Sequence, residues 1–539
     1  MELRFKFSWL LILLCFQASA KESLDNLIKQ QKNADAGTYR AHKLEKKDVY
    51  SNAQRHTFML GDLPQEKNCF LINRVELEHD FLGRQLSKAV NKAIAGRCVG
   101  SVGVQKIAAA LQDYYINAGY ITTRISLPAQ DISKGTLRLR VNAGKIEKTV
   151  VEGNDISEWM LPFQRNDILN IRDIEQGLEN LQRVPGVDVK INIEPGTRDG
   201  YSIVHINTQR GKTWSVRASY NNWGDEETGR YQTSAVGYLF NAAKMGDLFY
   251  VAGTRSTTGQ YENVSGYYSL PVGYWEYGFF YSKSQSQQAI PLSYSTLDYE
   301  GDSEYWSAKA SRTVYRDKNK KLAGSVELIR RKSAYTLNGE EITLQARDMG
   351  NVKLGLNYKQ QLPGAYWDST LSWQRFLTWF GGKETPDMVY GDVSPVSHVF
   401  NFAGNYTRQI NSGYYNAAFM AQYAPRELTL QDQITVGDRW SIRGFENSAG
   451  LSGNDGFYIK NTLTYPFMGG KASYYAGVDY GQIYQDASYG DETLIGAAVG
   501  IDGTIKSLEY NFSVSTPLKY PDTLDIDKVN VNFNFSYQM

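Results

Sequence analysis

Arg443, within the stretch RWSIRGFENS, is the residue whose type and position best suit specific chemistry in a strand-rich C-terminal region. A guanidinium binds a carboxylate through two parallel hydrogen bonds, so the position calls for an acidic partner. In KASYYAGVDYGQIY, apolar and polar side chains alternate, and Asp479 falls on the polar face with Gly477 and Gly481. These glycines leave space beside the carboxylate for another segment. The pattern makes Asp479 a candidate partner for Arg443, and the alternative is that Asp479 only lines a wet pore.

The sequence gives little support for a catalytic, nucleotide-binding or metal site. The chain has five histidines, and only His398 lies in the strand-rich region, so a Ser–His–Asp or Asp–His site has one weak candidate. We interpret His398 as a strand residue facing a lumen or a loop. The GKT at 211–213 fails as a phosphate-binding loop, because Ile206 stands where the motif needs glycine. Metal ligands at useful spacing are also missing from the sequence. We therefore expect no enzyme, no metal and no cofactor.

Composition narrows the protein class. With 58 basic and 57 acidic residues the formal net charge is +1, which gives no sign of nucleic-acid binding. Aromatic residues make up 13%, including 38 tyrosines, although the mean hydropathy is −0.45. This combination is typical of a β-barrel with aromatic girdles and a polar interior. A tyrosine-rich soluble β protein would also fit.

The N-terminus predicts export. Residues 1–20 contain a basic start, a short apolar core and an Ala-Ser-Ala cleavage site, as a signal peptide does. The apolar run is too short for a membrane anchor, and no later window approaches 18 apolar residues. In an oxidising compartment the two remaining cysteines, Cys69 and Cys98, should form a disulfide. Two free buried thiols are the alternative.

The segments that follow divide by pattern. Residues 21–45 predict a weak, nearly all-polar helix, and residues 46–67 a linker, with a disordered tail as the alternative for both. Residues 68–144 predict an α+β domain whose second helix could be capped by Ser101. Residues 145–210 repeat the same kinds of element, ending in a hairpin. Two small α+β domains in tandem follow from this order.

From residue 211 to 539 the sequence predicts strands with no convincing helix. Its end, KVNVNFNFSYQM, alternates strictly and places Phe533, Phe535, Tyr537 and Met539 on one apolar face. A soluble sandwich could alternate in this way. The signal peptide, the strand length and the uncharged apolar face of the last strand favour a membrane barrel. At about 20 residues per strand and connection, the region holds about sixteen antiparallel strands, which must close in lipid.

These motifs together resemble a known family. CFLINRVEL through GRCVG and YYINAGYITTRISLPAQDISKGTLRLRVNAGKIE resemble a first POTRA domain with both cysteines, and RDIEQGLENLQRVPGVDVKINIEPG resembles a second. SIRGF is similar to the VRGF-type motif of a long loop that folds into the pore, and GVDYG to its partner strand. The chain thus resembles TpsB-type outer-membrane transporters of two-partner secretion, the ShlB/FhaC/HecB haemolysin secretion/activation family that includes CdiB-like transporters.

The resemblance assigns roles to residues. It implies that loop 438–455 enters the lumen and that a salt bridge joins Arg443 to Asp479, while Ile442, Gly444 and Phe445 form the loop tip motif. It makes residues 21–45 a pore plug by position and polarity. Two departures stand out. Ser441-Ile442 precedes Arg-Gly-Phe where one apolar residue is usual, and the chain ends in methionine, so the C-terminal barrel signal would rest on Phe535 and Tyr537.

The resemblance also implies a function in type V protein transport. The chain would sit in the Gram-negative outer membrane with its POTRA domains in the periplasm. There it would export one large TpsA-type exoprotein, an adhesin, haemolysin or contact-dependent toxin, in an extended state without nucleotide hydrolysis. Its other partners would be outer-membrane lipids, lipopolysaccharide and the barrel assembly machinery, and no nucleic acid. A factor that assembles other barrels is the alternative, and a passive diffusion channel would not need two periplasmic domains.

Overall fold

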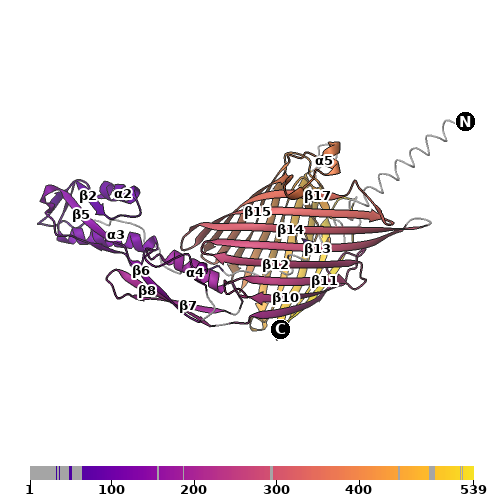
Figure 1. Cartoon of the computed structure of the whole chain (residues 1–539), viewed down its shortest axis with the longest axis horizontal. Helices are drawn as coiled ribbons and strands as arrows, with labels where there is room; N and C mark the ends of the chain where they lie inside the picture. The colour runs from indigo at the N-terminus through magenta and orange to yellow at the C-terminus, as the bar shows by residue number, and fades with distance from the viewer. Residues whose placement is uncertain are drawn as a thin grey trace.

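A computed structural model gives three bodies in a row, two small domains followed by a large barrel (Figure 1). The signal peptide predicted for 1–20 lies outside the residues that the structure describes. Of the helix predicted for 21–45, only residues 32, 35, 36 and 40 are described, each in helical conformation. The described residues are 32, 35–36, 40, 48–50, 63–153, 157–185, 187–209, 211–291, 295–391, 393–446, 450–484, 492–522, 524 and 526–539.

The first domain packs two helices on short strands. Its elements in chain order are β1 (Phe70–Ile72), β2 (Arg74–Glu78), α2 (Arg84–Ile94), β3 (Arg97–Val99), α3 (Ser101–Asn117), β4 (Arg124–Ser126) and β5 (Thr136–Asn142). One sheet has the order β2-β5-β4 and a second pairs β1 with β3. The strictly alternating strand β5 buries Leu137, Leu139 and Val141 under the helices, as its period-2 pattern predicts.

The start of α3 corrects one expectation. Ser101 does not cap the helix, because it is already its first helical residue and its side chain caps nothing there. Instead Glu66 accepts hydrogen bonds from the amides of Gly100, Val102 and Gly103 at 3.1, 3.0 and 2.8 Å. A carboxylate at a helix N-terminus is favourable because it meets unpaired N–H groups and the positive end of the helix dipole. The end of the predicted linker therefore caps a helix of the next domain.

The second domain has β6 (Lys145–Glu152), α4 (Ile171–Gln182), β7 (Asp188–Pro195) and β8 (Tyr201–Gln209), with sheet order β6-β8-β7. The side chain of Asn170 accepts from the amide of Arg172 at 2.9 Å and so caps α4. Helix α4 lies between the sheet and the nearest end of the barrel (Figure 1). We call this the domain end of the barrel, and the opposite end the far end.

The barrel closes with sixteen antiparallel strands and one two-residue strand, β16, which confirms the predicted fold class. The last strand pairs with the first from Asn534↔Asn221 to Gln538↔Arg217, so the described barrel sheet closes on itself. The strands are β9 (Trp214–Asn221), β10 (Gln232–Phe240), β11 (Leu248–Ser256), β12 (Tyr261–Val272), β13 (Trp275–Pro291), β14 (Thr296–Arg316), β15 (Lys320–Leu337), β16 (Glu340–Glu341), β17 (Arg347–Leu362), β18 (Ala365–Leu377), β19 (His398–Ile410), β20 (Gly413–Tyr423), β23 (Asp455–Phe467), β24 (Ala472–Tyr484), β25 (Glu492–Ile505), β26 (Leu508–Lys519) and β27 (Asn530–Gln538).

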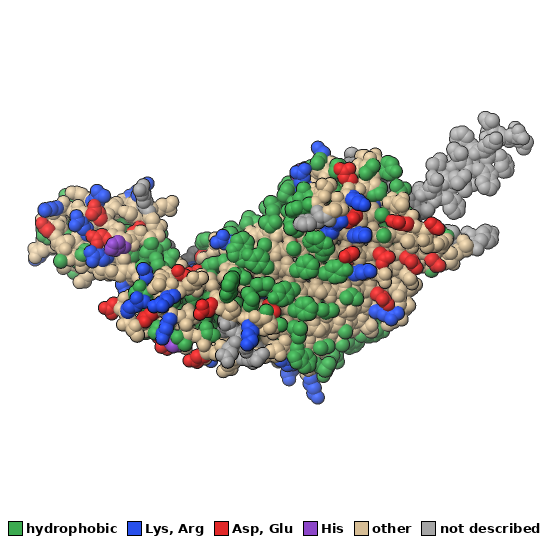
Figure 2. Space-filling view, viewed as in Figure 1, with side chains coloured by type: hydrophobic (Ala, Val, Ile, Leu, Met, Phe, Trp, Pro, Cys, Tyr) green, Lys and Arg blue, Asp and Glu red, His purple; other side chains and the backbone are tan. Residues whose placement is uncertain are grey.

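The outer face of the barrel is apolar. Hydrophobic side chains gather in a band over β10 to β15, and charged side chains gather toward the far end (Figure 2). Strand β24 shows the alternation behind this band, with Tyr474 and Val478 54% and 52% exposed on the outside and Asp479 fully buried inside. None of the helices in the described part of the chain has the length and apolar character needed to cross a bilayer.

Two elements differ from expectation. A five-residue helix, α5 (Pro386–Tyr390), lies in the connection between β18 and β19, where we expected no helix. The loop predicted at 438–455 is longer, because β20 ends at Tyr423 and β23 begins at Asp455. It includes a small hairpin of β21 (Ile434–Val436) and β22 (Leu451–Gly453). Short 3₁₀ turns occupy Ile132–Lys134, Glu158–Met160, Trp379–Gly381 and Met468–Gly470.

Candidate functional site

The loop between β20 and β23, which we call the lumenal loop, packs inside the barrel. Its apolar side chains form a core with inward residues of β24 and β25. Ile442 is 0% exposed and Phe445 1% exposed. The cluster consists of Ile434, Val436, Ile442, Phe445, Leu451, Ile483 and Leu494. The burial of these apolar side chains stabilises the position of the loop inside the lumen.

Arg443 and Asp479 meet at the base of this core. The Arg443 Nε donates to Asp479 Oδ2 at 2.7 Å, and Nη2 donates to Oδ1 at 2.7 Å. The backbone N–H of Arg443 also donates to Oδ2 at 3.0 Å. This is the bidentate geometry that a planar guanidinium forms with a carboxylate. The pair is buried, with side-chain exposures of 8% and 0%.

Strand β23 completes the arrangement through its backbone. The Asn461 N–H donates to Asp479 Oδ1 at 3.0 Å, and the Asn461 carbonyl accepts from Arg443 Nη2 at 2.6 Å. Asp479 thus accepts four hydrogen bonds, which offsets the cost of burying its charge. Three segments, the lumenal loop, β23 and β24, converge on one carboxylate.

Glycines provide the space for this approach. A Cβ at Gly477 would lie 1.8 Å from the Asn461 oxygen and 2.4 Å from Arg443 Nη2. A Cβ at Gly481 would lie 2.4 Å from Ile442 Cδ1. A Cβ at Gly496, on β25, would lie 1.7 Å from the Arg443 carbonyl oxygen. The two glycines chosen from strand alternation and a third from the next strand therefore lie where the loop touches the wall.

The loop tip is fixed on the other side by the last strands. Gly444 has φ 102°, and a Cβ there would lie 2.6 Å from the backbone of Thr516. Its carbonyl accepts from Asn530 Nδ2 of β27 at 3.0 Å. Glu446 accepts from the Gly444 N–H at 2.8 Å and from the Ser515 hydroxyl at 2.8 Å. A positive φ and close backbone contact explain the need for glycine before Phe445.

The described N-terminal residues also contact the lumen. Lys32 Nζ donates to the Gln433 carbonyl of the lumenal loop at 2.5 Å. Asp35 accepts from the Tyr261 hydroxyl of β12 at 2.9 Å. The Arg40 guanidinium lies 5.8 Å from the ring of Trp440, also in the lumenal loop. A cavity of about 460 Å³ lies beside Lys32 and Asp35.

Further along the N-terminal segment, Asp48 contacts the strands near the domain end. It accepts from Lys359 of β17 and Tyr366 of β18, each at 2.7 Å. The described N-terminal residues therefore touch the barrel interior from the far half to the domain end.

The remaining predicted site residues lie as follows. Cys69 and Cys98 form a disulfide with a Cα–Cα distance of 5.3 Å, tying the segment before β1 to β3. Phe533, Phe535 and Tyr537 lie on β27. Met539 follows that strand, and its N–H donates to the Val216 carbonyl of β9 at 3.0 Å.

His398 does not face the lumen. It begins β19 in the same alternation as the exposed Phe400 and Phe402, and its ring stacks on Trp373, whose Nε1 donates to His398 Nδ1 at 3.0 Å. Its position on the outer face at the far end removes it as a lumenal candidate. Side chains alternate between the two faces from the start of β19, and the first one, His398, points outward.

Sequence reasoning missed several contact residues. Asn461 acts through its backbone, so its side chain gave no signal. Glu446 and Asn530 are polar residues whose roles depend on tertiary contacts, across 69 positions for Glu446 with Ser515 and 86 for Asn530 with Gly444. Gly496 could have been predicted from the sequence. It lies on the same inward face of β25 as Leu494 and Ala498, and it pairs with Asp479 on the neighbouring strand.

Relatives of this chain include named transporters. Outer membrane transporter CdiB of Dickeya dadantii is 28% identical over 481 residues, covering 86% of each chain. Hemolysin transporter protein ShlB of Serratia marcescens is 27% identical over 441 residues, covering 78% of this chain and 77% of that protein. The solved structure of CdiB from Escherichia coli superposes with a TM-score of 0.84 at 24% identity, covering 95% of this chain and 98% of the other.

Models of known families match successive parts of the chain. A ShlB-type POTRA domain matches residues 70–144, and a second POTRA model matches 145–195. The model of the haemolysin secretion/activation protein ShlB/FhaC/HecB matches residues 200–503, more than half of the chain. The two small domains are therefore POTRA domains of the periplasm, and the barrel lies in the outer membrane. The chain belongs to the ShlB/FhaC/HecB family of haemolysin secretion/activation proteins.

Proposed function

We propose that this protein exports one large secreted partner, folded as a β-helix outside the cell, through the barrel in an extended state. The buried Arg443–Asp479 pair carries the proposal, because it fixes a long loop inside a lumen whose wall presents many polar side chains, among them Asn263, Ser265 and Asn351. A polar lumen lets an unfolded chain pass without giving it apolar surface on which to collapse. The names of the relatives, transporters for haemolysin and of the CdiB type, support this direction.

Recognition would begin at the POTRA domains. In the first domain β4 is an edge of its sheet, and in the second β6 and β7 are both edges. An edge strand presents unpaired N–H and C=O groups, so an extended segment of the partner can add to it as another strand. Leu127, just after β4, is 54% exposed and provides apolar contact beside that edge.

The resting lumen would be closed by two segments. The lumenal loop occupies it from the far end, and the contacts of Lys32, Asp35 and Arg40 support a plug formed by residues 21–45. Deleting 21–45 should raise the conductance of the protein in planar bilayers. Unchanged conductance would show that this segment does not close the pore.

Transport would not use nucleotide. The periplasm supplies none, so the driving force would be the folding of the partner outside, which prevents it from sliding back. An assembly factor for other barrels is the alternative function. The two differ in what they leave at the surface, either a secreted protein or an inserted barrel.

The test is co-expression in a Gram-negative host that lacks such transporters. The chain is produced with a large repeat exoprotein encoded beside its gene, and surface display is measured by protease accessibility on whole cells. We expect display only when the transporter is present. An exoprotein that stays in the periplasm beside a folded, inserted barrel would contradict the proposal.

A further inference from the structure

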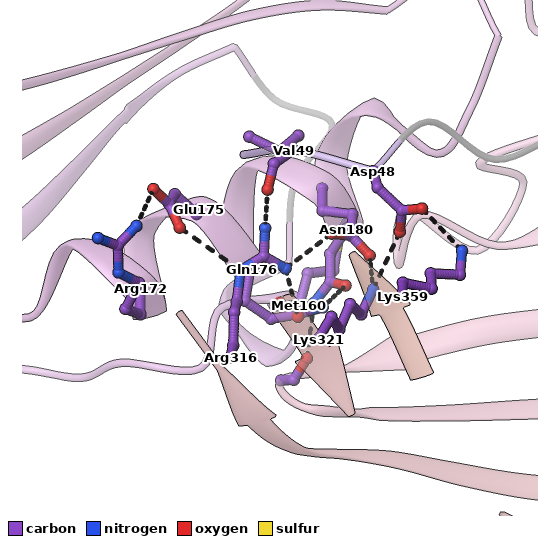
Figure 3. A network of polar contacts seen from close by, with 12 residues as sticks. Asp48, Val49, Met160, Arg172, Glu175, Gln176, Asn180, Arg316, Lys321 and Lys359 are labelled. Atoms are coloured by element: carbon purple, nitrogen blue, oxygen red, sulfur yellow. Dashed lines mark hydrogen bonds and ion pairs between the residues drawn. The ribbon is translucent and has the colours of Figure 1, made fainter. Parts of the chain in front are cut away.

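The periplasmic mouth of the barrel contains a cluster of charged side chains from three parts of the chain (Figure 3). Helix α4 of the second POTRA domain contributes Glu175 and Glu179. The barrel contributes cations near the periplasmic ends of its strands. The N-terminal linker contributes Asp48 and Val49, which contact cations of the barrel wall. The cations are Arg316, Lys321 and Lys359.

The carboxylate of Asp48 meets three donors from three strands. Lys359 Nζ lies 2.7 Å from Oδ2, Tyr366 donates to Oδ2 at 2.7 Å, and Lys321 Nζ lies 3.4 Å from Oδ1. The Asp48 side chain is only 10% exposed. Burial acts to raise the pKa of Asp48, but the two lysines outweigh it and hold the pKa below its usual value. The site is therefore built to hold a negative charge.

The next residue is recognised by its backbone. Arg316 donates from Nη2 to the Val49 carbonyl and from Nη1 to Glu179 Oε2 at 2.7 Å and Gln176 Oε1 at 3.0 Å. Glu179 also pairs with Lys321. A carbonyl is common to every residue, so this contact selects no side chain. Asp48, Val49 and Tyr50 have no regular secondary structure, and the pair of contacts suits an irregular or extended segment with one carboxylate.

Charge balance indicates what happens when the linker leaves. The ion pairs of the cluster join four cations, Arg172, Arg316, Lys321 and Lys359, to Glu175, Glu179, Asp368 and Asp48. Without Asp48, four positive charges face three negative ones within this described set. Lys321 would then keep Glu179, and Lys359 would keep Asp368 at 3.7 Å, so this little-exposed set would carry one excess positive charge and attract another carboxylate.

We propose that this cluster is a binding site for an extended polypeptide segment carrying a carboxylate, which the linker occupies at rest and the incoming partner takes over. The site lies between the POTRA domain that would receive the partner and the lumen that would export it. The identity of the incoming chain in this proposal rests on the proposed function. The linker acts here as an internal substitute that keeps the site filled until an acidic segment displaces it.

The test measures binding of a labelled peptide with the linker sequence EKKDVYSNA (45–53) to the full transporter in lipid nanodiscs. The D48N transporter lacks its own competing carboxylate, so it should bind the peptide about tenfold or more tightly than the wild type. The same peptide with asparagine in place of its aspartate should bind about tenfold or more weakly than the aspartate peptide. Adding K359M to D48N should remove the gain. K353M is the matched control, since Lys353 lies on the same strand and lines the lumenal cavity outside the cluster.

Two results would overturn the inference. One is absence of peptide binding to D48N, which would mean that the cluster serves only its own linker. The other is equal binding by D48N/K359M and D48N/K353M, which would place the peptide elsewhere. Neither result bears on export, which the co-expression experiment measures in the unmodified transporter. Failure of export with intact peptide binding would instead overturn the proposed function.

Discussion

Replacing Arg443 with alanine should release the lumenal loop from the barrel wall. The change removes both guanidinium bonds to Asp479, and Asp479 stays fully buried with only the amides of Arg443 and Asn461 as donors. Leaving one member of a buried ion pair without its partner costs about 3–5 kcal/mol. Because two of the four hydrogen bonds remain, we expect the lower end, about 3 kcal/mol. This corresponds to a roughly hundredfold larger fraction of released loop.

Thiol labelling measures that fraction. Val436 is 0% exposed in the loop hairpin, and cysteine is close to it in size, so V436C introduces a protected thiol. A membrane-impermeant reagent added outside the cell reaches this thiol only when the loop opens, and the labelling rate follows the opening equilibrium. R443A should raise the rate by roughly a hundredfold. R426A is the matched control, because Arg426 is an exposed arginine of the same loop.

A double variant separates lost charge balance from lost packing. In R443A/D479N the buried uncompensated charge is gone, so the labelling rate should fall back part of the way toward that of V436C alone. Wild-type labelling in R443A would refute the reasoning, since it would mean that the ion pair does not hold the loop. A double variant that labels faster than R443A would show that the charge on Asp479 is not the cause.

Three further predictions concern the supports of the site. Removing the disulfide with C69S/C98S should destabilise the first POTRA domain by about 3–4 kcal/mol, seen as earlier urea-induced proteolysis of that domain in the full chain. G477A, whose Cβ would lie 1.8 Å from a backbone oxygen, should cost about 1–3 kcal/mol or more and speed V436C labelling, whereas G253A, with open space around it, should not. Desolvation acts to raise the pKa of Glu66, but three backbone amides at the start of α3 lower it. The stabilisation by Glu66 is therefore present above its ordinary pKa and lost as the pH falls through the lowered value. E66Q should reduce thermal stability near pH 7 and leave it unchanged in strong acid, and an equal loss at both pH values would argue against the cap.

The position of Asp479 was predictable because strand alternation has a period of two and does not depend on knowing the neighbouring strands. The same logic placed Gly477 and Gly481. For His398 we used no such alternation and expected a strand residue facing a lumen or a loop, whereas it lies on the outer face at the start of β19. Strand alternation also did not give the length of the lumenal loop, because the loop begins where β20 ends at Tyr423 and itself contains the short paired strands β21 and β22.

The contacts of the linker had no local signature at all. Asp48 meets Lys359 across 311 positions, and Glu66 caps a helix that begins 35 residues later. Both lie in a polar stretch that has no periodicity, so composition alone suggested a linker. The contacts of Asp48 and Glu66 depend on how the POTRA domains and the barrel are placed around the linker. Only the assembled fold brings these groups together.

Export by the R443A transporter tests the central claim most directly. The variant and the wild type are produced at matched levels, barrel insertion is checked by heat-modifiable migration, and the exported partner is measured in the culture medium and at the cell surface. We predict that R443A inserts normally and loses most or all export, because the loop no longer holds its place in the lumen. Normal export by an inserted R443A barrel would contradict the account.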